Sequence, residues 1–537
     1  MAFLREDFKD GFTYLRIVET RRKDGKVIHE TLCNLGKAED YTPEMLQRIG
    51  TRLFLLGNGD LKELLGSGTK ELGRYNYGFY QIYHQIFCSL GLDIILNRIG
   101  KKHKIKFDLV QATLLMLIER LHDPCSKRAN HSHQEEYLGI DKTELQWLYR
   151  CLDYLADYNE LLQKQIFHST HDLFSQQLDV VFYDVTTFYF ESSVREEKKL
   201  RQYGFSKDGK IGNTQVLFAL LIDKNKNPIG FEVYSGNTFE GHTFEDAVKR
   251  IKDKYNIKDI VIVADRGMLS KQNIEITENN SYQFIVGDKI KVLPDEIKNY
   301  LLDIKNYTRE WTLPGDETHT VKYASIEYNR RLIITTYSQK RADKDKYERE
   351  EKLQRARQLI KHPSQLQHKA QHYYLQNINE NKYVLNEQRI RESERYDGFL
   401  AIATNARNLS AEIILDHYTH LFQIEQSFRT FKSYIETRPM FHWTDRRIMG
   451  HLTLCYIAYA MLISLLNKLK EGNLILTEEK LRTYIDKMQV SLVAQGNQQF
   501  YLRSKLCEVS KAILQKTGLR LMPDVFPKEH IIKYLKK

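Results

Sequence analysis

The sequence predicts a mixed α/β protein in which helical regions flank one central sheet. Three segments rich in β-branched and aromatic residues follow Asp179: VVFYDVTTFYF, TQVLFALLI and IGFEVY. A helical segment, FEDAVKRIKDKY, then precedes two apolar strands, IVIVA and YQFIV, with another helix between them. Three consecutive strands predict an antiparallel meander with short connections. Alternation of helices with buried strands predicts that the later strands run parallel.

The first part of the chain divides into a small β-element and a helical region. Residues 12–36 read as two strands around Asp24-Gly25, a pair that suits a hairpin turn, and we assign residues 1–41 to this element. Residues 42–175 carry apolar side chains at three- and four-residue spacing, which predicts an all-α domain. Within it, residues 98–106 hold five basic residues and no acidic one.

The α/β core, residues 176–289 and 396–447, is interrupted by an insertion over residues 290–395. The insertion begins with the β-like segments VKYASIEY and RLIITTY and continues as a charged helical stretch from Ser338 to Tyr396. The strand GFLAIAT and a long helix from about Ala411 to Ser433 return to the core. Residues 448–537 are expected to be helical, with the apolar run Leu452–Leu466 as a buried helix.

The composition indicates the cellular compartment of the protein and the charge of its binding partner. The 537 residues include six widely scattered cysteines with no C-x-x-C pair, which predicts a reducing compartment and no structural zinc. The first residues form no apolar stretch of signal-peptide length, so we expect the protein to stay where it is made. A net charge of +11 suits a polyanionic partner.

Two aspartates stand where buried strands end. Asp184 follows VVFY, and Asp265 follows IVIVA and precedes Arg266-Gly267. Open α/β sheets present their functional groups at the carboxyl ends of strands. An aspartate at such an end is more often a turn former or a helix cap, so neither residue is decisive alone.

A third carboxylate, Glu425, lies in the helical segment YTHLFQIEQSFRTFK. On a regular α-helix, Tyr418, Glu425 and Lys432 share one stripe, and Arg429 lies one turn beyond the glutamate. Two strand-end aspartates and one helix glutamate would supply the oxygen ligands that Mg²⁺ or Mn²⁺ selects. Such a site suits phosphoryl displacement with two metal ions, and the sequence holds no GxxxxGK[ST] or GxGxxG loop for nucleotide binding.

The segments YDVTTFYFES, VADRGMLS and YTHLFQIEQSFRTFKSYIETRPMFHWTDRRIMGH resemble the catalytic blocks of bacterial insertion-sequence transposases of the DDE type. The resemblance is to the group with a Tyr-x2-Arg-x3-Glu-x6-Lys signature. Tyr418, Glu425 and Lys432 match that signature, whereas Leu421 occupies its arginine position. Arg429 is a candidate substitute from the next turn. The N-terminal NLGK and the helical-domain segment DPCSKRA also resemble this group.

The resemblance implies a ribonuclease-H-like core in which Asp184, Asp265 and Glu425 are catalytic metal ligands for Mg²⁺ or Mn²⁺, with two ions per site. It implies cut-and-paste transposition by strand nicking, hairpin formation and strand transfer, performed by a homodimer on paired transposon ends. The substrates would be the terminal inverted repeats and target DNA, in the bacterial cytoplasm at the nucleoid.

The DNA-binding residues expected from the resemblance and the local sequence are Tyr418, Arg429, Lys432, Lys127 and Trp311. The signature residues would touch phosphates, and Trp311 would stack on a flipped base, as an insertion aromatic does in some relatives. Lys127 lies in a turn-like segment that would open a helix toward DNA. Residues 42–175 would then recognise the transposon ends or mediate dimerisation.

Two other functions stay open at this point. A catalytically inactive DNA-binding regulator derived from a transposase would need the basic surfaces and none of the carboxylates. A structure-selective nuclease with the same core would cut DNA without joining strands. Retention of all three carboxylates favours the active transposase over the regulator.

Overall fold

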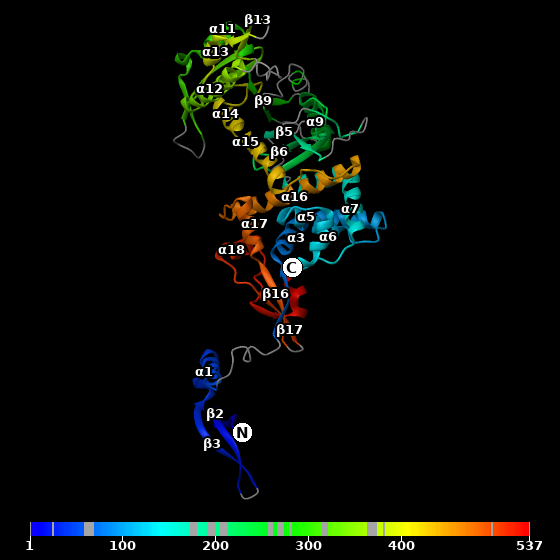
Figure 1. The fold of residues 1–537 in the computed structure, drawn as a ribbon, viewed down its shortest axis with the longest axis vertical. Helices are drawn as coiled ribbons and strands as arrows, with labels where there is room; N and C mark the ends of the chain where they lie inside the picture. Colours follow the sequence, from blue (N-terminus) through cyan, green and yellow to red (C-terminus); the bar gives the residue numbers. More distant parts are fainter. Residues whose placement is uncertain are drawn as a thin grey trace. The chain divides into compact units, whose positions relative to one another are not determined.

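The computed structural model of the chain describes residues 2–23, 26–57, 69–171, 180–191, 199–204, 212–255, 261–265, 273, 275, 278, 282–313, 320–361, 373–379, 382–495 and 498–535. The chain divides into two units (Figure 1). The first unit comprises Met1–Arg74, Val490–Arg503 and Pro523–Ile531. The second unit comprises Tyr75–Gln489, Ser504–Met522 and Ile532–Lys537.

The first unit contains two small antiparallel sheets. One consists of β1 (Ala2–Lys9), β2 (Phe12–Lys23) and β3 (Lys26–Lys37), and helix α1 (Pro43–Leu56) follows it. The hairpin predicted over residues 12–36 is confirmed, and β1 is an addition. The Asp24-Gly25 turn lies outside the described residues.

The other sheet has the strand order β18-β17-β16-β4. Its strands are β18 (Val525–Pro527), β17 (Gln498–Arg503), β16 (Gln489–Gln495) and β4 (Lys70–Asn76). Two predictions are therefore wrong: residues 42–175 are not all helical, and residues 448–537 contain strands. The sequence of β4, KELGRYN, is largely polar and exposed, so its strand conformation depends on pairing with distant β16.

The second unit is built on a nine-stranded mixed sheet, in the order β10-β11-β12-β15-β9-β8-β5-β6-β7. The meander β5-β6-β7 is antiparallel, and β8 runs parallel to both β5 and β9, as predicted. This strand order confirms the ribonuclease-H-like mixed core. The connection from β5 to β6 is long, not short as predicted. The strands are β5 (Val180–Tyr189), β6 (Gln215–Ile222), β7 (Pro228–Ser235), β8 (Val261–Ala264), β9 (Gln283–Asp288), β10 (Arg309–Thr312), β11 (Thr320–Tyr328), β12 (Arg331–Tyr337) and β15 (Phe399–Thr404).

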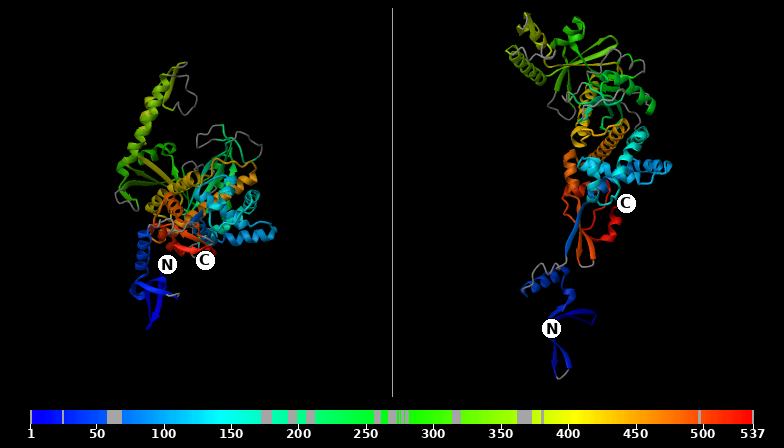
Figure 2. Two further views of the ribbon diagram at one scale, coloured as in Figure 1. Left: turned by 60° about the horizontal axis from the view of Figure 1, so that its bottom comes forward. Right: turned by 45° about the vertical axis from the view of Figure 1, so that its right-hand side comes forward.

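The segment assigned to an insertion continues this sheet. Strand β12 pairs with β15 of the core, and β11 and β10 follow outward. The rest of the segment holds α11 (Asp295–Leu302), α12 (Gln339–Lys361), the hairpin of β13 (Leu375–Asn379) and β14 (Lys382–Leu385), and α13 (Glu387–Glu394). The stretch predicted as helical from Ser338 to Tyr396 therefore includes a hairpin. Figure 2 shows α12 projecting from this end of the sheet.

The sheet buries different side chains on its two faces. On one face, Val181, Tyr183 and Val185 join a core cluster with Phe244 of α9 (Glu240–Tyr255) and Phe167 of α8 (Asn159–Thr170). On the other face, the ring of Phe218 lies 5.2 Å from Phe431, and that of Phe231 lies 4.9 Å from Tyr456 of α16 (Asp445–Glu471). Helices therefore cover both faces of the meander.

Helix α16 lies between the sheet and the helical region (Figure 1). It contacts β7 on one side and helices α3, α5, α7, α8 and α18 on others. It is long and apolar enough to cross a membrane, but 89% of that apolar window is buried inside the protein. The buried helix predicted over Leu452–Leu466 is confirmed. Other helices among the described residues are α3 (Gly78–Ser89), α4 (Leu92–Lys102), α5 (Leu109–His122), α6 (Lys127–His133), α7 (Leu145–Asp157), α17 (Glu478–Asp486), α18 (Glu508–Thr517) and α19 (Ile531–Leu535).

Close contact between α16 and α7 depends on Gly450. A Cβ at this position would lie 2.0 Å from the backbone oxygen of Leu152. We expect Gly450→Ala to lower the free energy of unfolding by about 1–3 kcal/mol, because the helices would have to move apart. Gly100 of α4 has nothing within 4 Å of its Cβ position, so Gly100→Ala is the matched control. The control should be neutral or stabilising by about 1 kcal/mol in urea denaturation. Equal stabilities for the two variants would contradict the close-packing interpretation.

Candidate active site

Asp184 and Asp265 hold matching positions on neighbouring parallel strands. The register of β5 and β8 pairs Val180 with Val261 and ends with Tyr183 paired with Ala264. Each aspartate is the next residue after that last pair. Asp265 directly follows β8, as predicted, whereas Asp184 lies within β5 and not at its end, because β5 continues to Tyr189 in pairing with β6. Because neighbouring strands lie about 4.8 Å apart, the register places the two residues at equivalent backbone positions of adjacent chain segments.

The same register assigns both aspartates to one face of the sheet. Side chains alternate along a strand, and Tyr183 and Ala264 belong to the core cluster on the α9 face. Asp184 and Asp265 therefore belong to the opposite face, where Phe218 meets Phe431. Asp184 is half-buried, and its Oδ1 accepts a 2.7 Å hydrogen bond from the amide of Val185, while Asp265 is exposed.

Glu425 comes to this face on α15 (Phe422–Arg429), which contacts β5 and β6. Ile424, Ser427 and Phe428 form the buried side of that helix, whereas Glu425 and Arg429 are exposed. The glutamate is thus presented beside the strand that carries Asp184, with its carboxylate accessible to a ligand.

The helix predicted from Ala411 to Ser433 is not one regular α-helix. It consists of α14 (Ala411–Thr419), a turn at His420 and Leu421, α15, and a π-helical turn over Thr430–Tyr434. The Asp416 carbonyl accepts bonds from both the Thr419 hydroxyl and the His420 backbone, which closes α14. Tyr418 and Lys432 therefore lie in different segments from Glu425, and the single stripe expected from a regular helix is wrong.

The donor set fits a hard divalent cation, since all three side chains offer carboxylate oxygens. The three residues do not form a group in which every ligand atom lies within 4.8 Å of the others in this structure. Three carboxylates repel one another, and a divalent cation between them offsets that repulsion. Their convergence on metal stays a prediction.

Lys127, expected to bind DNA, is buried with 3% of its surface exposed. The helix predicted after the turn does begin there, because the Ser126 hydroxyl accepts a bond from the Ala129 amide at the start of α6. The Lys127 ammonium, however, donates to Asn130 Oδ1 inside the protein, and burial lowers the pKa of Lys127 to about 7. This position does not offer the ammonium to a phosphate, so the expectation for Lys127 is corrected.

Trp311 is also a core residue, 8% exposed on strand β10, and its ring is not available for base stacking. Two aromatics that sequence reasoning did not single out are exposed instead: Phe441 at 68% and Trp443 at 57%. The guanidinium of Arg201 lies 4.7 Å from the Trp443 ring and 4.6 Å from the Phe190 ring. The signal was present in the sequence, because Phe441 and Trp443 belong to the same quoted segment as Glu425.

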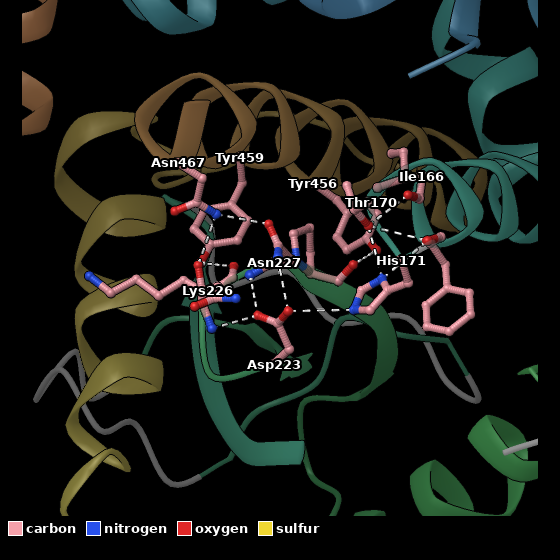
Figure 3. Close-up of polar contacts among 12 residues, drawn as sticks. Ile166, Thr170, His171, Asp223, Lys226, Asn227, Tyr456, Tyr459 and Asn467 are labelled. Atoms are coloured by element: carbon pink, nitrogen blue, oxygen red, sulfur yellow. Dashed lines mark hydrogen bonds and ion pairs between the residues drawn. The ribbon is translucent and has the colours of Figure 1, made fainter. Parts of the chain in front are cut away.

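The turn between β6 and β7 is held by a buried polar network (Figure 3). Asp223 accepts 2.8 Å bonds from the amides of Asn225 and Asn227, and its Oδ2 lies 3.5 Å from Nε2 of His171. On α16, Asn467 donates to the Asn225 carbonyl and to Asn227 Oδ1. The network joins the sheet, α16 and the end of α8 at one point.

This turn also contacts the helix that carries Glu425. Lys226, in a left-handed backbone conformation with φ 64°, donates through Nζ to Gln426 Oε1 at 2.6 Å. The Tyr459 hydroxyl donates to the Lys226 carbonyl at 3.0 Å and lies 2.7 Å from Ser427 Oγ. Both residues that follow Glu425 are thereby fixed, which restrains the rotation of α15 about its axis.

The Tyr459 hydroxyl is the buried link between α15, α16 and this turn. We expect Tyr459→Phe to lower the free energy of unfolding by about 1–3 kcal/mol, because Ser427 and the Lys226 carbonyl lose a buried partner. Tyr347→Phe, at a side chain 66% exposed, is the matched control and should change stability by less than about 0.5 kcal/mol. Chemical denaturation measures both, and equal effects would argue against a structural role for the hydroxyl.

Two parts of the chain match known protein families. The sequence profile of the family described as "Transposase DDE domain" matches residues 175–461, and that of "IS1634 family transposase, N-terminal domain" matches residues 5–63. The matched DDE segment contains all three candidate ligands. No curated protein sequence matches the chain.

Solved structures with some likeness include a piggyBac transposase synaptic complex with hairpin DNA, at 9% identity and a TM-score of 0.38. That match covers 86% of this chain and 83% of the other. A pre-cleavage Mos1 transpososome shares 13% identity with a TM-score of 0.15, over 36% of this chain and 58% of the other. The family assignment rests on the sequence profiles. Since the DDE profile spans more than half of the residues, the chain belongs to the DDE transposases.

Proposed function

We propose that this transposase moves an insertion sequence by cut-and-paste transposition, with Asp184, Asp265 and Glu425 as its catalytic metal ligands. The observation that carries the proposal is the β5/β8 register, which gives the two aspartates equivalent backbone positions, together with the packing of α15 on β5 and β6. The reaction sequence is strand nicking, hairpin formation and strand transfer. Each step is a phosphoryl transfer at the same three carboxylates.

A DDE domain implies dependence on a divalent metal. We propose Mg²⁺ or Mn²⁺, with two ions held by Asp184, Asp265 and Glu425. When bound, such ions activate the attacking water or 3′-hydroxyl and stabilise the leaving oxygen. The protein contributes rigid placement of the ligands: the strand register fixes both aspartates, and the Lys226 and Tyr459 contacts fix the helix that carries the glutamate.

The proposed substrates are the terminal inverted repeats of the element and target DNA, bound by a homodimer on paired ends in the cytoplasm. The net charge of +11 supports a polyanionic partner. Within the helical region, Lys101, Lys102, Lys104 and Lys106 are all exposed and lie at the end of α4 and in the loop after it. They are suited to phosphate contacts during end recognition.

Near the carboxylates, we propose that Arg429, Lys432 and Tyr418 contact phosphates beside the scissile bond. Arg429 is exposed one turn after Glu425, and Lys432 is half-buried in the π-helical turn. For base stacking we propose Trp443 in place of the buried Trp311, because its ring is 57% exposed. Arg201 beside that ring adds a cation to the same surface.

The carboxylate assignment predicts separate effects on cleavage and on binding. Asp184→Asn, Asp265→Asn and Glu425→Gln should each lower the rate of end cleavage by at least roughly 10²-fold, because each amide replaces a charged metal ligand. Binding to the ends should stay nearly unchanged. The measurements are cleavage of DNA carrying the inverted repeat and a gel-shift titration with the same DNA.

Glu392→Gln, at an exposed position on α13, is the matched control and should cleave normally. Normal cleavage by Glu425→Gln would refute the assignment of that residue. A wild-type protein that binds the ends without cutting them would favour the inactive regulator, and cutting without strand transfer would favour the structure-selective nuclease.

The phosphate contacts predict a change in salt dependence. Lys432→Ala and Arg429→Ala should each weaken binding to all DNA sequences alike and reduce the slope of log K against log salt by about one unit, through counterion release. Lys511→Ala on α18, where the lysine pairs with Glu508, should leave the slope unchanged. Loss of binding confined to particular base pairs would indicate base readout in place of phosphate contact.

A further inference from the structure

Three side chains of different ligand types gather where α5 ends and α6 follows. The ligand atoms of Glu119, Cys125 and His133 all lie within 4.8 Å of one another, and they form the one such group among the described residues. The Cys125 Sγ lies 3.0 Å from Glu119 Oε2, and His133 Nδ1 lies 3.6 Å from the same oxygen. This cluster includes none of the catalytic carboxylates.

The separation of His133 from Glu119 falls within the range found around zinc, and that of Cys125 from Glu119 lies slightly below it. Zinc binds thiolate sulfur at about 2.3 Å and imidazole nitrogen or carboxylate oxygen at about 2.0–2.2 Å, so neighbouring donors in a tetrahedron lie roughly 3.3–3.8 Å apart. Small adjustments of the three side chains would place one ion between them. A thiolate and an imidazole also select zinc over the hard cations that carboxylates alone prefer.

The buried carboxylate gives a second, independent indication of a missing cation. Glu119 is 1% exposed, and its Oε1 accepts no well-formed hydrogen bond among the described residues; the Tyr137 hydroxyl, which bonds to His122, interacts with this carboxylate. The other oxygen, Oε2, accepts a 3.2 Å hydrogen bond from Asn130 Nδ2. The same nitrogen donates to Cys125 Sγ at 2.9 Å. Asn130 thus orients two of the three donors, as residues behind a metal ligand commonly do.

Two basic residues lie close to the cluster, and both are engaged elsewhere. Arg120 donates to the backbone carbonyls of Ile435, Glu436 and Cys125. Lys127 donates to Asn130 Oδ1 at 3.3 Å. Neither residue forms an ion pair with Glu119 in the described part of the chain, which leaves that carboxylate to a metal.

We propose, in contrast to the prediction of no structural zinc from cysteine spacing, that Glu119, Cys125 and His133 bind one zinc ion, with a water molecule at the fourth position. On binding, a zinc–sulfur bond replaces the thiol S–H bond, and the proton leaves to solvent, with no change of oxidation state. His133 has 36% of its side chain exposed and provides the route of entry. The ion would join the end of α5 to α6, at a site independent of the proposed DNA chemistry.

The test uses the full-length chain, stripped of metal by a chelator and then titrated with Co²⁺ in excess Mg²⁺. Co²⁺ substitutes for zinc and gives a charge-transfer absorption in the near ultraviolet when a thiolate binds it. We expect one saturable equivalent with this band, and competition by Zn²⁺. Cys125→Ser should lose the band, and His133→Ala should weaken Co²⁺ binding at least tenfold.

Cys33→Ser, at an exposed cysteine, is the matched control and should keep the band. Circular dichroism checks that each variant folds, and His133→Ala changes a partly exposed side chain in case Cys125→Ser does not fold. Absence of the band in the wild type, or its persistence in Cys125→Ser, would overturn the proposal. Either result leaves the assignment of Asp184, Asp265 and Glu425 untouched, because that assignment is tested by cleavage.

Discussion

The burial of α16 is the constraint on which the second unit depends. A 27-residue helix with an apolar window on all sides has to be enclosed by protein, and here the helical region encloses one side and the sheet another. Two of its polar side chains form hydrogen bonds with a neighbouring turn of the sheet. Tyr459 and Asn467 reach the β6–β7 turn, and that turn reaches the helix that carries Glu425.

Local sequence patterns were sufficient for most of the catalytic sheet. The meander, the parallel strands β8 and β9 and the buried α16 follow from apolar runs and alternation, which act over a few residues. The strand β4 could not be predicted this way, because its polar sequence becomes a strand only through pairing with β16. The break at His420 and the π-helical turn were missed for a related reason, since both depend on how individual carbonyls are shared.

In the candidate site, too, some features could be predicted from local sequence patterns and others could not. That Asp184 and Asp265 belong to neighbouring strands was readable from two apolar runs, but only Asp265 follows the end of its strand, because β5 continues past Asp184 to Tyr189. Whether a single charged or aromatic side chain is buried or exposed could not be predicted from the sequence. Lys127 and Trp311 were expected to contact DNA, yet both are buried, while Trp443 is exposed. Burial of one residue depends on the packing of distant elements, which neither spacing nor composition records.

The pairing of β12 with β15 determines how force passes between the outer strands and the core of the sheet. Six consecutive residue pairs join the segment assigned to an insertion to the core, and β15 is in turn bonded to β9, two strands from β5. A sheet resists shear along its hydrogen-bonded direction, so β10 to β12 cannot swing as a separate body without breaking that ladder. A load applied to these strands by a bound duplex would therefore be transmitted to the strands that carry the aspartates. Helix α12 and the β13–β14 hairpin lie outside that ladder, and α12 is joined to the residues before β15 by side-chain contacts, such as the ion pair of Arg349 with Asp397, in place of strand pairing.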